Sequence, residues 1–214
     1  MAAARVLATA VMMATVLTSG VAAWAGAPTE QLRGRIDRVL QVLEDPQLKS
    51  EARTPERRQA VRTIVEEIFD FRELSQRSLG PHWKARTPAE RDEFVQLFAD
   101  LLERSYITKI ELYSGGERIQ YTAEALDGDD LATVRTKIIT KQGTEVPVDY
   151  RMHRVDARWL VYDVAIEGVS LVANYRAQFN KIIQRSSFKG LLAQLVAKRD
   201  EAASDGPVKR ASQR

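Results

Sequence analysis

Apolar residues in the first half of the chain recur every three or four positions, which is the spacing of one face of an α-helix. Such stripes cover residues 32–43, 54–69 and 71–79, and each stretch has a proline at one end. Proline is tolerated in the first turn of a helix or just beyond its end. The pattern therefore predicts three amphipathic helices in succession.

A fourth and longer helix has the clearest start in the sequence. The segment Thr87-Pro88-Ala89-Glu90 is a capping box with proline at the first helical position. In a capping box, the side chains of Thr87 and Glu90 each accept a hydrogen bond from the other residue's backbone amide. The apolar stripe then runs from Phe94 to Ile110, so we expect a helix over about residues 88–110.

From residue 119 onward, apolar and polar residues alternate, which is typical of strands with one buried face. Segments with this pattern cover residues 119–125, 134–140 and 146–152, and a fourth segment covers residues 158–167. Four strands joined by short turns predict an antiparallel meander. Pro147 indicates either that its strand lies at an edge or that its missing N–H points outward.

The fourth strand is apolar on both faces, so both faces must be covered. Strict alternation places Leu160, Tyr162, Val164 and Ile166 on one face, and Trp159, Val161, Asp163 and Ala165 on the other. After Gly168 the helical spacing returns, which predicts helices over residues 171–183 and 188–198. The chain from Asp200 onward is small and charged, and we expect a disordered tail there.

These elements predict one α+β domain over residues 26–199, in which helices wrap around a strongly curved, four-stranded antiparallel sheet. A sheet of this kind covered by helices makes a cone with a hollow interior. The chain from residue 26 to its end is a little under 190 residues long, which suits one domain with a sizeable core.

The first 25 residues have the organisation of a secretory signal peptide. Arg5 is the only charge before an apolar run, and Ala23 and Ala25 then occupy the two small-residue positions of a cleavage site. Cleavage two residues later would leave a proline in the first mature position. The apolar run is also shorter than the roughly 20 residues that span a bilayer, which argues against an uncleaved anchor. We therefore expect export to the periplasm and a mature chain that begins at Gly26.

Charge and cysteine content argue against several classes of function. The chain has 32 Lys and Arg against 29 Asp and Glu, and loss of Arg5 with the signal peptide leaves a net charge of +2. The sequence has no cluster of basic residues with stacking aromatics, so nucleic-acid binding is not expected. The absence of cysteine excludes disulfides, thiol nucleophiles and thiolate metal sites.

Candidates for catalysis and metal binding are few. His82 and His153 are expected to be surface residues, and the sequence contains no zinc-ligand spacing, nucleophile elbow, phosphate-binding loop or dinucleotide fingerprint. Asp163, in a mostly apolar strand, is either a general base or a carboxylate bonded to a backbone amide or an arginine. We favour the second interpretation. The sequence therefore predicts no catalytic residue, no metal site and no cofactor.

The segment from Trp159 to Arg176 reads WLVYDVAIEGVSLVANYR. This string closely resembles the MlaC family, also called toluene-tolerance or Tgt-type periplasmic phospholipid-binding proteins. Supporting matches are GPHW at residues 80–83 and GLL at residues 190–192. The resemblance covers roughly residues 30–197.

The resemblance implies a cone-shaped fold similar to nuclear-transport-factor-like domains, with a deep apolar cavity for phospholipid acyl chains and the headgroup left outside. Proteins of this family shuttle phospholipid between an outer-membrane lipoprotein–porin complex and an inner-membrane ABC transporter complex, and so maintain outer-membrane asymmetry. A related branch is associated with hopanoid transport, and the motif does not separate the two branches. The resemblance thus implies a phospholipid carrier without cofactor. A hopanoid carrier and a hydrophobic-substrate isomerase that uses Asp163 remain as alternatives.

The candidate ligand-binding residues follow from the predicted faces of the elements, because the family has no short signature for its lipid contacts. On the fourth strand the uncharged face is expected to line the cavity, together with the apolar faces of its neighbours and of the helices that close it. Apolar stripes alone would also suit a filled core. The predicted lining consists of Phe94, Phe98, Leu101, Tyr106, Val134, Ile138, Val148, Tyr150, Met152, Leu160, Tyr162, Val164, Ile166, Val172 and Tyr175.

A closed cavity needs an opening, and glycines mark two candidate hinges. The segment 106–118 contains Gly115-Gly116, and Gly168 follows the fourth strand. Each position is either a hinge or an ordinary break between elements.

Overall fold

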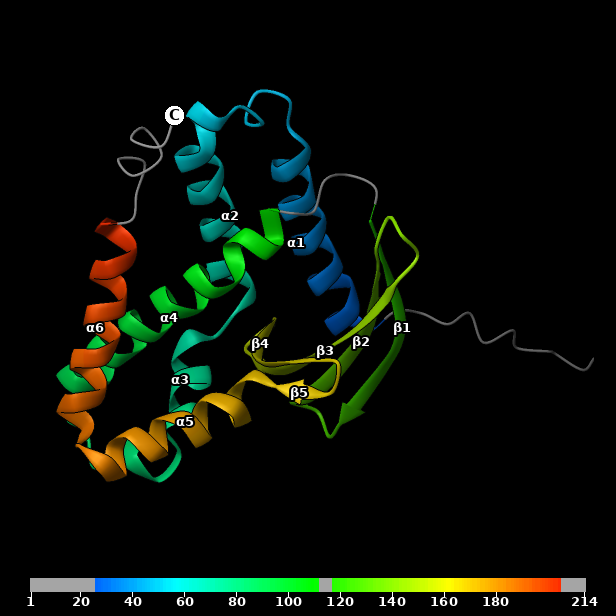
Figure 1. Ribbon diagram of the computed structural model, residues 1–214. Coiled ribbons are helices and arrows are strands. Elements are labelled where there is room, and N and C mark those ends of the chain that lie inside the picture. The colour runs from blue at the N-terminus through cyan, green and yellow to red at the C-terminus, as the bar shows by residue number, and fades with distance from the viewer. Residues whose placement is uncertain (1–25, 112–116, 205–214) are drawn as a thin grey trace, which may run out of the picture.

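Helices precede and follow an antiparallel sheet along the chain, as the change from helical to strand spacing and back predicts, and they lie above and to the left of the sheet in Figure 1. The computed structural model describes residues 26–111 and 117–204. In chain order the elements are α1 (Ala27–Glu44), η1 (Glu51–Arg53), α2 (Thr54–Ile68), α3 (Phe71–Leu79), η2 (Gly80–Trp83), α4 (Pro88–Glu111), β1 (Arg118–Asp127), β2 (Leu131–Ile139), β3 (Glu145–Val155), β4 (Arg158–Ile166), β5 (Val169–Ser170), α5 (Leu171–Arg185) and α6 (Phe188–Ser204). The predicted α+β class is confirmed.

Several helix starts are fixed by side chains that accept hydrogen bonds from backbone amides. The predicted capping box of α4 is present: the Thr87 amide donates to Glu90 Oε2 at 2.8 Å, and the Glu90 amide donates to Thr87 Oγ1 at 3.2 Å. Helix α1 is capped from the sheet, because Glu124 of β1 accepts from both the amide and the hydroxyl of Thr29. The first cap is encoded locally, whereas the second needs the folded sheet.

The sheet is an antiparallel meander with the strand order β1-β2-β3-β4-β5, one strand more than the sequence predicts. The extra strand is β5, whose Val169 pairs with Ile166 of β4. Glu167 and Gly168 form the two-residue turn between them, with φ of 50° and 80°. Positive φ at both central positions is typical of a tight β-hairpin turn. Gly168 therefore lies in a hairpin and not at a direct junction between strand and helix.

Pro147 lies in an interior strand, so the edge-strand interpretation is wrong. Strand β3 has β2 on one side and β4 on the other. Strand β4 ends at Ile166, and the following Glu167 amide donates to the Pro147 carbonyl at 2.9 Å. The missing N–H of Pro147 thus lies beyond the end of β4, where it interrupts no paired strand.

Two apolar clusters hold the elements together. In the first, α1, α2 and the last turns of α4 pack on one face of the sheet, which we call the inner face. In the second, α3, α4, α5 and α6 pack against one another. Phe69, which follows α2, contacts both clusters. The helical part and the sheet therefore share one continuous apolar interior.

Helix α6 runs to Ser204, beyond the expected start of a tail at Asp200. The predicted signal peptide, Gly115-Gly116 and residues 205–214 lie outside the described residues. Within the described ranges, no helix is both long enough and apolar enough to cross a membrane.

Candidate functional site

The inner face of the sheet is lined by apolar side chains from three neighbouring strands. Cross-strand pairs include Ile138 with Val146, Tyr150 with Val164, and Val148 with Ile166. Alternation along each strand sends these side chains to the same side of the sheet. Seven of the predicted lining residues lie in or against this cluster: Val134, Ile138, Val148, Tyr150, Met152, Val164 and Ile166.

A β-bulge in β4 places the two halves of the predicted lipid-facing side of this strand on opposite faces of the sheet. Arg151 pairs with Asp163 but Met152 pairs with Val161, so Tyr162 is an extra residue with no partner on β3. An extra residue reverses the direction of every side chain beyond it. Val161, which was assigned to the other face, therefore joins the inner face together with Trp159.

Leu160 and Tyr162 consequently lie on the outer face, so their assignment to the same face as Val164 and Ile166 is wrong. The register pairs Leu160 with His153 on that side of the sheet. The ring of Tyr162 contacts the ring of His153 and lies 4.0 Å from the guanidinium carbon of Arg77 in α3. Strict alternation over the whole strand could not show this reversal.

Six further predicted residues lie in the helical cluster and not at the sheet: Phe94, Phe98, Leu101, Tyr106, Val172 and Tyr175. Phe98 packs edge-on against Tyr175 and Phe179, with ring centroids 4.9 and 5.0 Å apart. Phe94 and Phe98 are 0% and 1% exposed. These contacts are those of a close-packed aromatic core, so the structure does not bring these residues to the inner face of the sheet.

Helices α1 and α2 cover the inner face instead, together with the end of α4. Their buried residues include Leu32, Ile36, Val61 and Ile64, and Ile107 of α4 joins them. Sequence reasoning assigned none of these residues to the cavity. The two-sided apolar character of β4 was the available signal, because it required a helical layer on each face.

Several side chains on this sheet face are only partly buried, although α1 and α2 pack over it. Burial raises the pKa of Tyr150 to about 12, although the side chain remains partly accessible. Tyr121 has a buried hydroxyl with no hydrogen-bond partner among the described residues, and burial raises its pKa as well. Apolar side chains such as Ile138, Val146 and Ile166 are also only partly buried here. A fully packed core would leave these groups less accessible.

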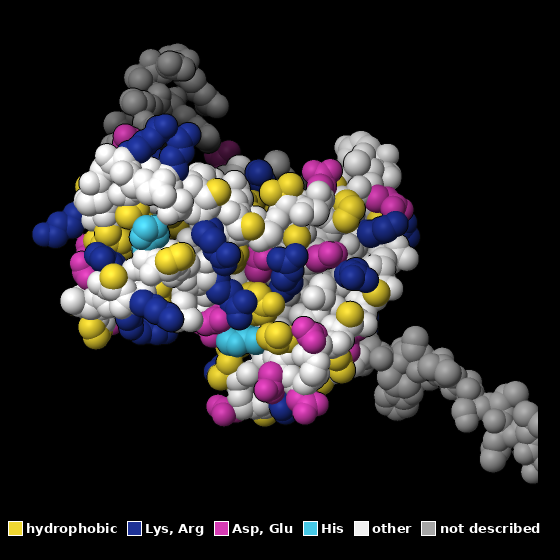
Figure 2. All heavy atoms as spheres, turned by 90° about the horizontal axis from the view of Figure 1, so that it is seen from below, with side chains coloured by type: hydrophobic (Ala, Val, Ile, Leu, Met, Phe, Trp, Pro, Cys, Tyr) yellow, Lys and Arg dark blue, Asp and Glu magenta, His cyan; other side chains and the backbone are white. Residues whose placement is uncertain are grey.

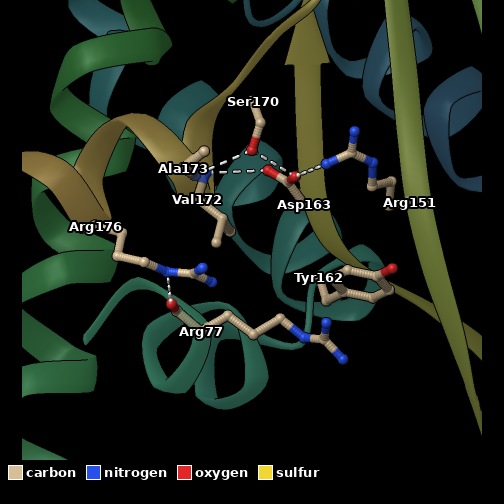
Figure 3. Close-up of a pocket in the computed structure, with 8 residues that line it drawn as sticks. All are labelled: Arg77, Arg151, Tyr162, Asp163, Ser170, Val172, Ala173 and Arg176. Carbon is tan, nitrogen blue, oxygen red and sulfur yellow. Dashed lines mark hydrogen bonds and ion pairs between the residues drawn. The ribbon is translucent and has the colours of Figure 1, made fainter. Parts of the chain in front are cut away.

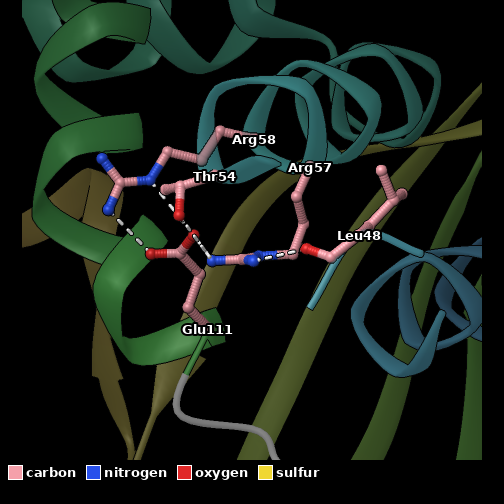
Figure 4. A network of polar contacts seen from close by, with 5 residues as sticks. All are labelled: Leu48, Thr54, Arg57, Arg58 and Glu111. Carbon is pink, nitrogen blue, oxygen red and sulfur yellow. Dashed lines mark hydrogen bonds and ion pairs between the residues drawn. The ribbon is translucent and has the colours of Figure 1, made fainter. Parts of the chain in front are cut away.

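A polar cluster holds the end of α4 against the start of α2, beside this interior (Figure 4). Glu111 accepts hydrogen bonds from Arg57 Nη2 at 3.1 Å and from Arg58 Nη2 at 2.8 Å. Arg57 also donates to the carbonyl of Leu48. The hydrogen bond from Arg58 is the main reason why the pKa of Glu111 is lowered, although partial burial opposes this shift. The end of α4 is thus tied to α2 by charge-assisted hydrogen bonds from two arginines.

Asp163 lies on the outer face and is bonded by three donors, as the favoured interpretation predicts. Arg151 Nη1 donates to Oδ2 at 2.7 Å, Ser170 Oγ to Oδ2 at 2.7 Å, and the Val172 amide to Oδ1 at 3.0 Å. The residue is 2% exposed. Both carboxylate oxygens are engaged, so Asp163 anchors the start of α5 to the sheet.

The structure brings together no cluster of metal ligands in the parts of the chain that it describes. Groups of three or more His, Cys, Asp or Glu side chains at ligand distance are absent from residues 26–111 and 117–204. His82 Nε2 is 2.9 Å from Asn180 Oδ1, and His153 Nε2 is 3.1 Å from Asp70 Oδ2. Both histidines are partly buried and thus less exposed than expected.

A solved structure shares this architecture. The phospholipid-binding protein from Ralstonia solanacearum, solved in complex with a phospholipid, superposes with a TM-score of 0.72 at 26% sequence identity. The similarity covers 83% of this chain and 99% of the Ralstonia chain.

Two curated relatives match about half of the chain. The intermembrane phospholipid transport system binding protein MlaC of Haemophilus influenzae is 26% identical over 121 residues, which are 55% of this chain and 56% of that protein. The toluene tolerance protein ttg2D of Pseudomonas putida is 27% identical over 129 residues, 58% of this chain and 59% of that protein. The chain thus matches less than two thirds of the length of either relative.

The family model described as MlaC protein matches residues 33–197, from within α1 to near the end of α6. The match therefore includes the whole sheet, the second apolar cluster, all of the first cluster except Leu32, and the segment from Trp159 to Arg176. On this evidence, the chain belongs to the MlaC protein family.

Proposed function

We propose that this protein is a carrier that holds phospholipid by its acyl chains, in the interior between the inner sheet face and helices α1 and α2. The observation that carries the proposal is the structural match to the Ralstonia protein, which was solved with a phospholipid and is covered over 99% of its chain. The proposed lining consists of Val134, Ile138, Val148, Tyr150, Met152, Trp159, Val161, Val164 and Ile166, with Ile107 on the helical side.

Burial of hydrocarbon supplies the driving force for such binding. Each methylene removed from water contributes about 0.8 kcal/mol, so an acyl chain of about 16 carbons contributes roughly 12 kcal/mol. The same free energy opposes the transfer of a bare acyl chain through water. A protein that encloses the chain removes most of this cost, and it needs no cofactor to do so. The headgroup can remain hydrated, so the interior needs no buried counter-charge.

The wider role follows from the family and from the first 25 residues. The Haemophilus relative is named as the binding protein of an intermembrane phospholipid transport system. We propose that this chain is exported, is cleaved after Ala25, and works in the periplasm. There it would exchange lipid with an inner-membrane ABC transporter complex and an outer-membrane lipoprotein–porin complex, and so maintain outer-membrane asymmetry.

The position of Asp163 argues against the isomerase alternative. A general base must reach its substrate with a free lone pair. Asp163 is bonded by Arg151, Ser170 and Val172, and it lies on the face of the sheet opposite the proposed lipid site.

Native mass spectrometry of the protein purified from a periplasm tests the proposal, followed by lipid extraction and identification. We expect a stoichiometric adduct whose extracted mass and fragments are those of a glycerophospholipid. A hopanoid in place of the phospholipid would support the second kind of carrier instead. Protein that is fully folded and free of lipid, and that takes up none from phospholipid vesicles, would contradict the carrier proposal.

A further inference from the structure

A recess lies on the outer face of the sheet, between strands β3 and β4 and helices α3 and α5. Its volume is about 300 Å³. Three arginines from three different elements reach it: Arg77 of α3, Arg151 of β3 and Arg176 of α5 (Figure 3). Tyr162, the bulged residue of β4, forms part of its wall.

This recess is separate from the proposed lipid interior. The pair Arg151–Asp163 points to the outer face, whereas the neighbouring pair Tyr150–Val164 points to the inner face. The sheet therefore lies between the two sites. A group bound at the arginines would not be in contact with acyl chains held on the inner face.

Each of the three guanidinium groups uses one nitrogen to bond the protein. Arg77 Nε donates to Glu73 Oε1 at 2.7 Å, Arg151 Nη1 donates to Asp163 Oδ2 at 2.7 Å, and Arg176 Nε donates to the Arg77 carbonyl at 2.8 Å. The other nitrogens of these groups have no hydrogen-bond acceptor within residues 26–111 and 117–204. Since every guanidinium has five N–H donors, most of the donors at this recess are available to a ligand.

The bonds already made hold these donors in position. Arg77 stacks on the ring of Tyr162, with 4.0 Å between the guanidinium carbon and the ring centroid. Arg176 is fixed by its bond to the Arg77 carbonyl, and in Figure 3 its guanidinium group points into the opening between Asp163 and Arg77. Donors that are ordered in advance lose less entropy when a ligand binds.

The charge of the recess is positive on the side that faces solvent. Three arginines face two carboxylates, those of Glu73 and Asp163. The side chain of Asp163 is only 3% exposed, while that of Arg151 is 45% exposed. Asp163 also occupies the amide at the start of α5, so an incoming anion would meet guanidinium groups and not the helix terminus. Figure 2 views the molecule from the side of α5 and shows several Lys and Arg side chains near the centre of this surface.

We propose that this recess binds a phosphate group. Guanidinium groups from separate elements approach the opening from different directions. A tetrahedral phosphate presents oxygens in several directions and can accept from all of them, whereas a single carboxylate presents two oxygens in one plane. The phosphate can belong to free inorganic phosphate or to a phospholipid headgroup at a membrane surface. Both sources offer the same chemistry to Arg77 and Arg176.

The test is a calorimetric titration of the full mature protein with inorganic phosphate in a chloride buffer. The variant R77Q/R176Q removes two of the three guanidinium groups and leaves the Arg151–Asp163 pair intact. R176Q/R185Q is the matched control for charge, because it also removes two positive charges but keeps Arg77, and R185Q alone controls for charge on α5 outside the recess. We expect the double variant R77Q/R176Q to bind phosphate at least about tenfold more weakly, because it loses several charge-assisted hydrogen bonds. R176Q/R185Q should lose less affinity, and R185Q should bind like the wild type.

A second arm separates the two sources of phosphate. Flotation with phosphatidylglycerol vesicles is measured with and without competing inorganic phosphate. Vesicle binding that needs Arg77 and Arg176 assigns the recess to headgroups, while binding of inorganic phosphate alone with the same dependence assigns it to the free anion. The proposal is overturned if neither probe binds, or if R77Q/R176Q binds both probes like the wild type. The phosphate titration does not require lipid in the interior, so its outcome is independent of the proposed carrier function.

Discussion

Replacing Val164 with tryptophan should separate a hollow interior from a filled one. Val164 lies on the inner face of β4, opposite Tyr150 of β3, and is 6% exposed. In a close-packed core, an inserted indole forces its neighbours apart and destabilises the fold. In a cavity that holds an acyl chain, the indole takes the place of part of that chain. We therefore expect V164W to remain folded and to lose lipid.

The expected loss of lipid affinity follows from the part of the acyl chain that the indole displaces. Tryptophan has about seven more heavy atoms than valine, each occupying a space comparable to one methylene. If the indole displaces only half that many methylenes, at about 0.8 kcal/mol each, binding weakens by about 3 kcal/mol. A change of this size lowers the affinity about 100-fold.

The assay is the ratio of lipid to protein by native mass spectrometry, with circular dichroism and thermal unfolding of the same samples. L160W is the matched control, because Leu160 is also buried in β4 but points to the outer face. Whatever stability L160W loses, its folded fraction should keep lipid at the wild-type ratio. If V164W unfolds while its folded remainder carries lipid like the wild type, Val164 belongs to a filled core and the proposed lining is wrong.

Four further predictions follow from named contacts. E111Q should lower the free energy of unfolding by about 1–2 kcal/mol at neutral pH, because it removes the charge that Arg57 and Arg58 contact. The pKa of Glu111 is lowered in the folded state. In denaturant titrations, the difference in free energy of unfolding between the wild type and E111Q should therefore be largest above about pH 5, and it should disappear as the pH falls through that pKa. D163N should lower the free energy of unfolding by about 3 kcal/mol, because it leaves buried donors without their carboxylate. The ratio of lipid to folded protein should not change, and a wild-type stability of D163N would contradict this account. E124A should destabilise the fold by about 1 kcal/mol in chemical denaturation, through the lost cap of α1, and an unchanged midpoint would refute that role. Intact-mass measurement of the exported protein should give a chain that begins at Gly26, and retention of the first 25 residues would contradict the predicted cleavage.

Features that depend on neighbours in the sequence were predictable from the sequence alone. The start of α4 is decided by Thr87 and Glu90, which are three residues apart and bond each other directly. The helical stripes and the two-residue alternation locate most elements, because each period reflects the geometry of its own backbone. The hydrogen bonding of Asp163 was also predictable from the sequence, since two of its donors, Ser170 and Val172, follow within nine residues.

The exact faces of the strands were decided by pairing, which a single strand does not reveal. Bulges at Thr122 and Tyr162 each add one residue between paired positions. In β1 this turns Glu124 toward α1, where it caps the helix, although simple alternation favoured Ala123 and Ala125 for the buried side. A shift by one residue exchanges the two faces of a strand, so an error at one position alters every assignment beyond it.

Only the tertiary structure decided which apolar stripe covers which surface. Helices α1 and α4 both carry an apolar stripe, yet α1 packs on the inner sheet face while most of α4 packs among other helices. The hydrophobic effect is not directional, so the sequence of an apolar stripe does not determine which surface it packs against. The arginine recess has the same origin, because Arg77, Arg151 and Arg176 are far apart in the chain and meet only where α3, β3 and α5 converge.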